Sequence, residues 1–472
     1  MSLKRTKIVA TVGPSSSERA TLADMATAGA DVFRLNFSHG TTEDHVAAGR
    51  RVRAVAEQSG RNLALLQDVQ GPKIRIGTFR EGVVEVVAGR RFDLVPGERA
   101  GDETGVSISY EKFPGDVEVG QVVLIDDGQV RLRVTGVETG VVTTEVEVGG
   151  RLADRKGVNA PGLDPSLPAL TDKDIGDLEL GVELGVDWVA LSFVRRAADL
   201  ELARHYLERF GSEARLMAKI ETPLAIERFD EILEAADGIM VARGDLGVEM
   251  APEEVPVIQK RLIGAAHVAG KPVITATQML ESMVEHTRPT RAETSDVANA
   301  IFDGTDAVML SAETASGRYP VESVAMMQRV ATVVEESPEF EARRRTLRPE
   351  PARTTPGAIA KAACEVAETL TARAIVVFSA GGSSALRIAR NRPRIPVLAL
   401  TPSPKVRAAL ALTFGLRTEL APMVTDADDM VRMARERLRT HAMADPGDCI
   451  VITAGVPFGA AGTTNLVWVE TV

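Results

Sequence analysis

The sequence predicts an α/β protein with a (βα)8 barrel, a small β-barrel lid domain inserted into it, and a C-terminal α/β domain with a mostly parallel sheet. Three observations predict this architecture. Eight short apolar runs alternate with amphipathic stretches, one long segment replaces this alternation with period-two patterns, and the alternation resumes after a polar connector. Because 472 residues are too many for one core, we expect the barrel over residues 1–70 and 166–345, the inserted domain over 71–165 and the C-terminal domain over 353–472.

The predicted barrel strands are apolar runs that end abruptly in polar residues, as buried parallel strands do where they meet a ligand site. The runs cover residues 7–12, 32–36, 63–68, 187–192, 216–220, 238–241, 272–276 and 307–310. Amphipathic helices are predicted between most of them, at 19–28, 172–184, 198–210 and 254–269. Active sites of this fold lie at the carboxyl ends of the strands. We therefore expect the polar residues there to share one mouth: Arg34, Asn36, Ser38, Asp68, Ser192, Lys219, Glu221, Arg243, Asp245, Thr275, Thr277 and Ser311.

The inserted segment is rich in Val and Gly and alternates in hydrophobicity, for example at 130–134 and 141–148. It also carries the turn Asp126-Asp127-Gly128. Because the segment follows the third barrel strand, it would hang over the mouth. We expect a lid that excludes water once substrates bind, with flexible joints near Gly71-Pro72 and at 161–168.

The C-terminal domain follows Arg343-Arg344-Arg345 and a polar connector that runs to Pro356. Its alternation of strands and helices predicts a mostly parallel sheet covered by helices. The predicted strands are 374–378, 396–400, 449–453 and 466–469, and the predicted helices are 357–369, 384–390 and 427–441.

Composition excludes several classes of protein. A net charge of -11 argues against a nucleic-acid partner or an anionic membrane surface, although a local basic pocket for a phosphorylated metabolite remains compatible with it. Two cysteines, Cys364 and Cys449, match no metal-ligand spacing and no disulfide framework, which fits a reducing compartment. No apolar run approaches the ~18 residues needed to span a bilayer. We expect a cytoplasmic protein.

Lys219, Glu221 and Asp245 are the strongest candidates for catalysis. Carboxylates are hard ligands, and Mg²⁺ commonly takes one or two of them together with substrate oxygens. Side chains alternate along a strand, so Lys219 and Glu221 point the same way into the mouth. An exposed acidic pair, or a structural salt bridge between Lys219 and Glu221, is the alternative interpretation.

A second cluster follows the second and third strands. Arg34, Asn36 and Ser38 share one face, and the Arg34 guanidinium can clamp a phosphate or pair with an acid at the rim. Asp68 could complete an oxygen cage with Asn36 and Ser38, pair with Lys73, or do both at once. Neither Ser192 nor Ser311 has a histidine partner in a recognisable pattern, which favours transfer without a covalent enzyme intermediate.

In the C-terminal domain, a Ser- and Gly-rich loop opens a helix directly after a strand. Its backbone N–H groups and hydroxyls could cradle a phosphate, or the loop is a plain turn with a serine cap. A second Gly-rich loop, at 455–465, could complete an effector pocket. The candidate effector residues are Ser379, Gly381, Gly382, Ser383, Ser384, Gly462 and Thr463.

Four segments give the chain a specific resemblance to the pyruvate kinase family and, within it, to the bacterial K⁺-independent branch. They are 34–40 (RLNFSHG), 219–221 (KIE), 276–283 (ATQMLESM) and 309–315 (MLSAETA). The resemblance runs nearly end to end. It implies Mg²⁺-dependent phosphoryl transfer from phosphoenolpyruvate to ADP, giving pyruvate and ATP, with Mn²⁺ as an alternative ion. It also implies a homotetramer activated by a phosphorylated effector, such as AMP or a sugar phosphate.

The same resemblance implies a role for each matching residue. Glu221 and Asp245 would hold Mg²⁺, while Arg34 and Lys219 would neutralise the moving phosphoryl group. Gly244, Asp245 and Thr277 would hold the substrate carboxylate, and Thr277 and Ser311 would protonate the enolate through water. The residues implied at the nucleotide are Pro14, Asn36, His39, Arg75, Asp127 and Lys156.

One departure from the common family pattern changes the expected cofactors. Many members hold K⁺ around the residues that match Asn36, Ser38, Asp68 and Val69, and carry Glu at the position of Lys73. The resemblance to the branch with Lys implies that the Lys73 ammonium replaces the ion. We therefore expect activity that does not require K⁺, with Asp68 as the partner of Lys73.

Two other functions share some of these features. A metal-dependent lyase or aldolase acting through an enolate would need the acidic pair, but neither a nucleotide lid nor Lys219. A catalytically silent metabolite sensor would keep the fold and the C-terminal loops. The joint presence of Arg34, Lys219, Glu221, Asp245 and Thr277 argues against a silent protein.

Overall fold

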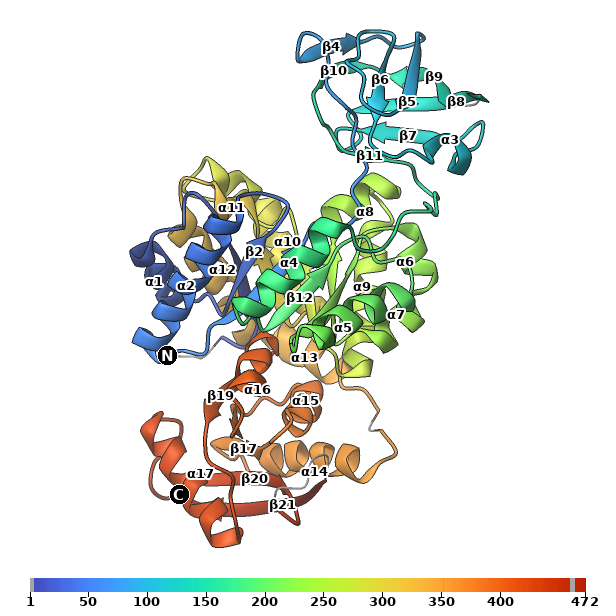
Figure 1. Ribbon diagram of the computed structural model, residues 1–472. Helices are drawn as coiled ribbons and strands as arrows, with labels where there is room; N and C mark the ends of the chain where they lie inside the picture. Colours follow the sequence, from blue (N-terminus) through green and yellow to red (C-terminus); the bar gives the residue numbers. More distant parts are fainter. Residues whose placement is uncertain (1–3, 139, 351, 459–462) are drawn as a thin grey trace.

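The computed structural model describes residues 4–138, 140–350, 352–458 and 463–472. Figure 1 shows three parts in a row, with a β-rich domain beyond one end of a central barrel and an α/β domain against the other end. The order of these parts agrees with the architecture that the sequence predicts. In these described ranges, no helix is long and apolar enough to cross a membrane.

The central part is a closed barrel of eight parallel strands in the order β1-β16-β15-β14-β13-β12-β3-β2. Each strand begins and ends within one residue of its predicted bounds. The strands are β1 (Lys7–Val12), β2 (Val32–Asn36), β3 (Ala64–Val69), β12 (Trp188–Leu191), β13 (Arg215–Ile220), β14 (Gly238–Ala242), β15 (Val273–Ala276) and β16 (Ala307–Leu310). The predicted (βα)8 barrel is confirmed.

Helices surround the barrel, and several begin at a residue whose side chain caps them. Thr41, Thr171 and Thr290 each form a capping box with the acid three residues later, which satisfies two otherwise unpaired backbone N–H groups. The helices are α1 (Arg19–Ala28), α2 (Thr42–Ser59), α4 (Asp172–Glu183), α5 (Ala197–Arg209), α6 (Pro223–Glu227), α7 (Phe229–Ala235), α8 (Arg243–Glu249), α9 (Val255–Ala269), η1 (Glu281–Val284), α10 (Arg291–Asp303), α11 (Ala312–Ala315), α12 (Pro320–Glu336) and α13 (Pro338–Thr346).

The β-rich domain is inserted after β3, as predicted, and has its own core around Phe92, Ile108, Phe113 and Leu132. Its strands pair as a six-stranded sheet, in the order β11-β7-β8-β9-β5-β6, and as a separate β10-β4 ribbon. The elements are β4 (Val83–Val86), β5 (Arg91–Pro96), β6 (Gly105–Ile108), α3 (Phe113–Asp116), β7 (Val122–Ile125), β8 (Val130–Glu138), β9 (Val141–Val148), β10 (Gly150–Ala153) and β11 (Val158–Asn159).

The C-terminal domain is a five-stranded sheet in the order β19-β18-β17-β20-β21, parallel except for β21. Two separate apolar cores pack against it, one involving α17 and the other α14 and α15. The strand β19 was not predicted. The elements are α14 (Thr355–Thr369), β17 (Ala374–Phe378), α15 (Ser383–Arg390), β18 (Val397–Thr401), α16 (Pro404–Ala409), η2 (Leu410–Leu412), β19 (Leu416–Leu420), α17 (Ala427–Thr440), β20 (Cys449–Gly455) and β21 (Thr464–Thr471).

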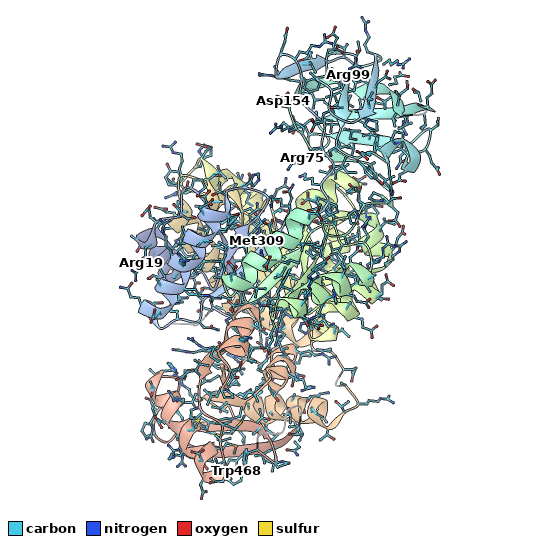
Figure 2. All side chains as sticks on the ribbon, viewed as in Figure 1. Arg19, Arg75, Arg99, Asp154, Met309 and Trp468 are labelled. Carbon is cyan, nitrogen blue, oxygen red and sulfur yellow. The ribbon has the colours of Figure 1, made fainter. Side chains whose placement is uncertain are left out.

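The C-terminal domain closes the lower end of the barrel. Ala411 and Leu412, from η2, belong to the same apolar cluster as Met309 and the other side chains inside the barrel. The Trp188 indole on β12 donates a hydrogen bond of 3.1 Å to the carbonyl of Ala409. Figure 2 marks Met309 within the barrel and Trp468 at the far end of the C-terminal domain.

Candidate active site

Charged side chains from β2, β3 and β13 meet at the carboxyl end of the barrel. The Lys219 ammonium lies 2.8 Å from Glu221 Oε1 and 3.2 Å from Asp68 Oδ1, and donates a hydrogen bond of 2.7 Å to Ser192 Oγ. Arg34 Nε lies 2.6 Å from Asp68 Oδ2. Five residues from four separate segments of the chain therefore form one continuous network, as the strand pattern predicted.

Strand register explains this convergence. Asn36 on β2 pairs with Asp68 on β3, so both strands reach the mouth at the same height. Lys219 and Glu221 lie two residues apart at the end of β13, which places their side chains on the same face. The backbone N–H of Phe193 donates to Glu221 Oε2 at 2.8 Å, and Phe193 adopts the left-handed conformation (φ 54°). Neither the strained backbone of Phe193 nor its N–H bond could be read from the sequence.

The network holds its charges in a buried environment. Burial alone would raise the pKa of Asp68, but Arg34 and Lys219 hold it below its usual range. Burial disfavours the Lys219 ammonium, yet the carboxylates of Asp68 and Glu221 raise its pKa overall. Burial raises the pKa of Glu221 despite the adjacent Lys219, and the nearby Asp245 carboxylate adds to this rise. Lys219 is therefore a permanently charged cation.

The opposite side of the mouth is formed by α8 and the loop after β15. The Gly244 N–H, in the first turn of α8, donates to Thr277 Oγ1 at 2.8 Å, and Asp245 is the next residue. Thr277 and Gln278 are both left-handed, with φ of 67° and 53°. The Arg243 guanidinium fixes this unusual loop, because it donates to the carbonyls of Ala276 and Thr277.

Glu313 links the loop after β15 to the loop after β16. Its carboxylate accepts hydrogen bonds from the N–H groups of Leu280 (3.0 Å) and Ser311 (2.6 Å). Burial raises the pKa of Glu313 against these backbone donors. The sequence placed Glu313 within a specific motif but assigned it no role. Its contacts hold the segments that carry Thr277 and Ser311.

Comparisons with known proteins identify the family of this chain. The family model "Pyruvate kinase, barrel domain" matches residues 3–324, and "Pyruvate kinase, alpha/beta domain" matches residues 357–470. A pyruvate kinase of Agrobacterium vitis is 46% identical over 463 residues, which cover 98% of this chain and 97% of that protein. This chain belongs to the pyruvate kinase family.

Two further proteins show the same likeness. A pyruvate kinase of Mycobacterium tuberculosis (strain ATCC 25618 / H37Rv) is 44% identical over 467 residues, covering 99% of this chain and 98% of that protein. The crystal structure of a pyruvate kinase from Cryptosporidium parvum matches with a TM-score of 0.94 at 33% identity, covering 99% of this chain and 96% of that one. The chain is thus a phosphotransferase that converts phosphoenolpyruvate and ADP into pyruvate and ATP. Pyruvate kinases generally need Mg²⁺, and often K⁺.

The residues predicted at the nucleotide are divided between the barrel and the inserted domain. Pro14 follows β1, and His39 follows β2, where its N–H donates to the carbonyl of Asn36. In the inserted domain, Lys156 pairs with Asp126 at 2.9 Å and Arg75 donates to the carbonyl of Arg155. Figure 2 marks Arg75 where the inserted domain joins the barrel.

The expected pairing of Asp68 with Lys73 is not found. Asp68 is occupied by Arg34 and Lys219, and the Lys73 side chain makes no ion pair or hydrogen bond within the described part of the chain. It lies instead beside Gly157 in the stalk of the inserted domain, that is, in the two segments (71–75 and 156–168) that connect this domain to the barrel. Asn36, Ser38 and Val69 do lie next to the network. Asn36 Oδ1 accepts from the Ser38 N–H, and the Val69 carbonyl accepts from Ser192 Oγ.

The two loops of the C-terminal domain adjoin each other. Ser384 Oγ and Thr464 Oγ1 are 2.5 Å apart, which connects the start of α15 to the end of the second loop. The Ser383 hydroxyl accepts from Arg387, and Gly382 is left-handed at φ 85°. The remaining candidates lie in the same two loops, except that Gly462 falls outside the described residues.

Proposed function

We propose that phosphoryl transfer takes place at the strand-end network, where Arg34 and Lys219 neutralise the charge of the transferred group. The observation that carries this proposal is the buried Lys219 ammonium, which is directed into the mouth by Asp68, Ser192 and Glu221. Phosphoryl transfer requires little covalent chemistry from the protein, so positioned positive charge supplies most of the catalysis.

Glu221 and Asp245 fit the requirements of a Mg²⁺ ion. Both are carboxylates at the mouth, and the raised pKa of Glu221 reflects burial together with the proximity of Asp245. Among the described residues, no group of three or more acidic, His or Cys side chains is arranged for a metal. Two carboxylates suit Mg²⁺, which usually completes its shell with substrate oxygens and water. When bound, Mg²⁺ or Mn²⁺ supplies charge neutralisation to the phosphoryl group.

Thr277 and its neighbours are proposed to hold the rest of phosphoenolpyruvate. The backbone of Gly244 and Asp245, with the Thr277 hydroxyl, would bind the carboxylate. Thr277 and Ser311 would deliver a proton to the enolate through water. The hydrogen bonds from Gly244 to Thr277 and from the Ser311 N–H to Glu313 support a fixed geometry at this step.

The lid is proposed to complete the nucleotide site. Pro14, Asn36 and His39 would contact ADP from the barrel, and Arg75, Asp127 and Lys156 would reach it from the lid. In the described residues no hydrogen bond or ion pair joins these three lid side chains to the strand-end network. They would therefore reach the nucleotide only when the lid closes, which also excludes water from the mouth.

Lys73 is proposed to remove the need for K⁺. Its ammonium has no ion-pair partner in the described structure and lies on the stalk of the lid, so lid closure is the movement that would bring it to the oxygens around Asn36, Ser38, Asp68 and Val69. The rate should not change when K⁺ replaces another cation at constant ionic strength. A strong rise with K⁺ would refute this role.

The loops at 379–384 and 455–465 are proposed to bind a phosphorylated effector such as AMP or a sugar phosphate. The hydrogen bond between Ser384 and Thr464 supports a joint pocket. We further propose a cytoplasmic homotetramer, which the resemblance to the family implies. Sedimentation of the purified protein, with and without each candidate effector, tests the assembly and the effector together.

The catalytic assignment is tested by pyruvate formation from phosphoenolpyruvate and ADP with Mg²⁺, in wild type, Lys219→Met and Lys260→Met. Loss of the positioned Lys219 charge should lower kcat by at least ~10²-fold. Lys260, which pairs with Asp303 on the outer helices, is the matched control and should leave kcat within about twofold. If Lys219→Met retains wild-type kcat, the assignment is wrong.

A further inference from the structure

Helix α8 connects the proposed metal site to the lid. Asp245 lies in its first turn, and Glu249 is its last residue. The Glu249 carboxylate accepts a hydrogen bond of 2.7 Å from the Asn159 side-chain amide, on the last strand of the lid before the chain returns to the barrel. A helix of seven residues therefore has the proposed metal ligand near one end and a lid contact at the other.

Glu249 contacts the lid through a single hydrogen bond. It is partly buried, and Asn159 is its sole hydrogen-bond or ion-pair partner within the described ranges. Burial raises the pKa of Glu249 even though the bond from Asn159 opposes the rise, and the Asp245 carboxylate contributes to it. A partly buried carboxylate with a single protein donor gains little stability from that hydrogen bond. The hydrogen bond from Asn159 therefore indicates that Glu249 serves as a contact with the lid.

The other contacts of the lid stalk leave α8 free to respond. Arg195 donates to the carbonyls of Pro165 and Leu167, at 2.6 and 2.8 Å, and fixes the returning segment to the barrel beyond the lid. Between this clamp and α8 lies a cavity of about 70 Å³. Pro72, Val158, Phe193, Thr222, Leu224 and Glu249 contribute to its lining. Because the stalk is not close-packed here, it can shift relative to the barrel.

Two walls of this cavity also touch the proposed metal site. The Phe193 N–H holds Glu221, and Thr222 is the residue after Glu221. At the far end of α8, the Gly244 N–H holds the Thr277 hydroxyl. A displacement of α8 would therefore move Asp245 and the proposed carboxylate subsite together.

We propose that the Asn159–Glu249 hydrogen bond transmits the position of the lid to α8, and that Glu249 is a positioning residue for Asp245. This inference rests on the proposed role of Asp245 in holding the divalent ion. The lid would then do more than cover the mouth, because its stalk would set the geometry of one metal carboxylate.

Binding of Mn²⁺ to the full-length protein, followed by electron paramagnetic resonance with phosphoenolpyruvate present, tests the link directly. Asn159→Ala and Asn159→Asp should each weaken Mn²⁺ binding about tenfold, the second because it places a carboxylate against Glu249. Glu249→Gln keeps an oxygen that accepts from Asn159, so its affinity should stay within about threefold of wild type. Glu253→Ala, an exposed acid just after α8, is the matched control.

The single variant Glu249→Ala and the double variant Asn159→Ala/Glu249→Ala complete a double-mutant cycle with Asn159→Ala, which gives the decisive comparison. If the two side chains act as one link, the double variant should bind Mn²⁺ no more weakly than either single variant. Additive losses, or wild-type affinity in Asn159→Ala, would overturn the proposal. Asp245→Asn tests separately whether Asp245 binds the metal. Unchanged Mn²⁺ affinity in that variant would refute the metal assignment itself. Thermal melting of each variant is the control that distinguishes a loss of Mn²⁺ affinity from unfolding.

Discussion

The barrel is joined to its two neighbouring domains in opposite ways. The C-terminal domain is joined by buried charges and by a shared apolar core. The lid is joined by a few hydrogen bonds around a cavity and by ion pairs of the exposed Asp164 with Arg195, Arg196 and Arg228. Arg392, fully buried, pairs with Asp306 at 3.3 Å, donates to His267 Nδ1 at 3.1 Å, and lies 4.1 Å from the centre of the Phe414 ring. No comparable buried ion pair joins the described part of the lid to the barrel.

One barrel thus combines a fixed end with an adjustable one. Removing one partner of a buried ion pair leaves an unpaired buried charge, so the C-terminal interface resists any local opening. Hydrogen bonds at the edge of a cavity can be exchanged for bonds to water at little net loss. The end of the barrel that carries the inserted domain is thus weakly held, and the opposite end is held strongly.

The largest expected effect comes from breaking the fixed interface. Arg392→Met removes the partner of Asp306, whose pKa burial already raises against the opposing Arg392 charge. The free energy of unfolding should fall by about 3–5 kcal/mol, measured from the urea midpoint. Lys405→Met breaks the exposed interdomain pair with Glu213 and should change it by less than ~1 kcal/mol. Equal effects of the two substitutions would contradict the comparison.

A smaller effect is expected from acid. Burial, with the charges of Arg392 and Arg390, lowers the pKa of His267 to about 3. The unfolded chain takes up this proton near pH 6.5, so the unfolded state binds more protons below that pH and stability falls as the pH decreases toward 3. Between pH 7 and 5, wild type should lose about 1–2 kcal/mol more than His267→Asn, which keeps an acceptor for Arg392 but cannot titrate. Parallel stability curves for the two proteins would be evidence against a neutral buried histidine.

The smallest effect is expected at the lid. Asn159→Ala removes the bond to Glu249, and the free energy of unfolding should change by less than ~1 kcal/mol because water can reach the released groups. Urea denaturation of Asn159→Ala and Arg392→Met under the same conditions compares the loss in free energy of unfolding at the two ends of the barrel. A loss at the lid as large as that at Arg392 would show that both ends are equally rigid.

The sequence predicted the barrel and the mouth because both depend on local patterns. Apolar runs define the strands, and parallel strands necessarily bring their carboxyl ends together, so Arg34, Asp68, Lys219 and Glu221 could be assigned to one site from the sequence alone. Their actual partners could not be predicted. Several cations were possible ion-pair partners of Asp68 on the sequence alone. The register of the barrel strands determines that Arg34 and Lys219 pair with it.

Contacts between domains were beyond the reach of sequence reasoning. Asn159 and Glu249 lie in separate domains with no pattern that relates them, and Arg392 follows α15 as one arginine among several. The strand β19 was missed because Leu416–Leu420 is short and carries charged residues, as befits the edge of a sheet. Periodicity reports which face of an element is buried, not what is buried against it.

The ion pair between Lys219 and Glu221 competes with the binding of other ions at the mouth, because each of the two side chains could instead bind a ligand of opposite charge. Two cations, Arg34 and Lys219, face three acids, Asp68, Glu221 and Asp245, so the network has a formal charge of −1. An anion that draws the Lys219 ammonium toward itself releases Glu221 for another cation. Under the proposed assignment, a phosphate-bearing substrate and the divalent ion each strengthen the binding of the other by the same factor. Affinity measured for either one alone will understate the affinity that operates during turnover.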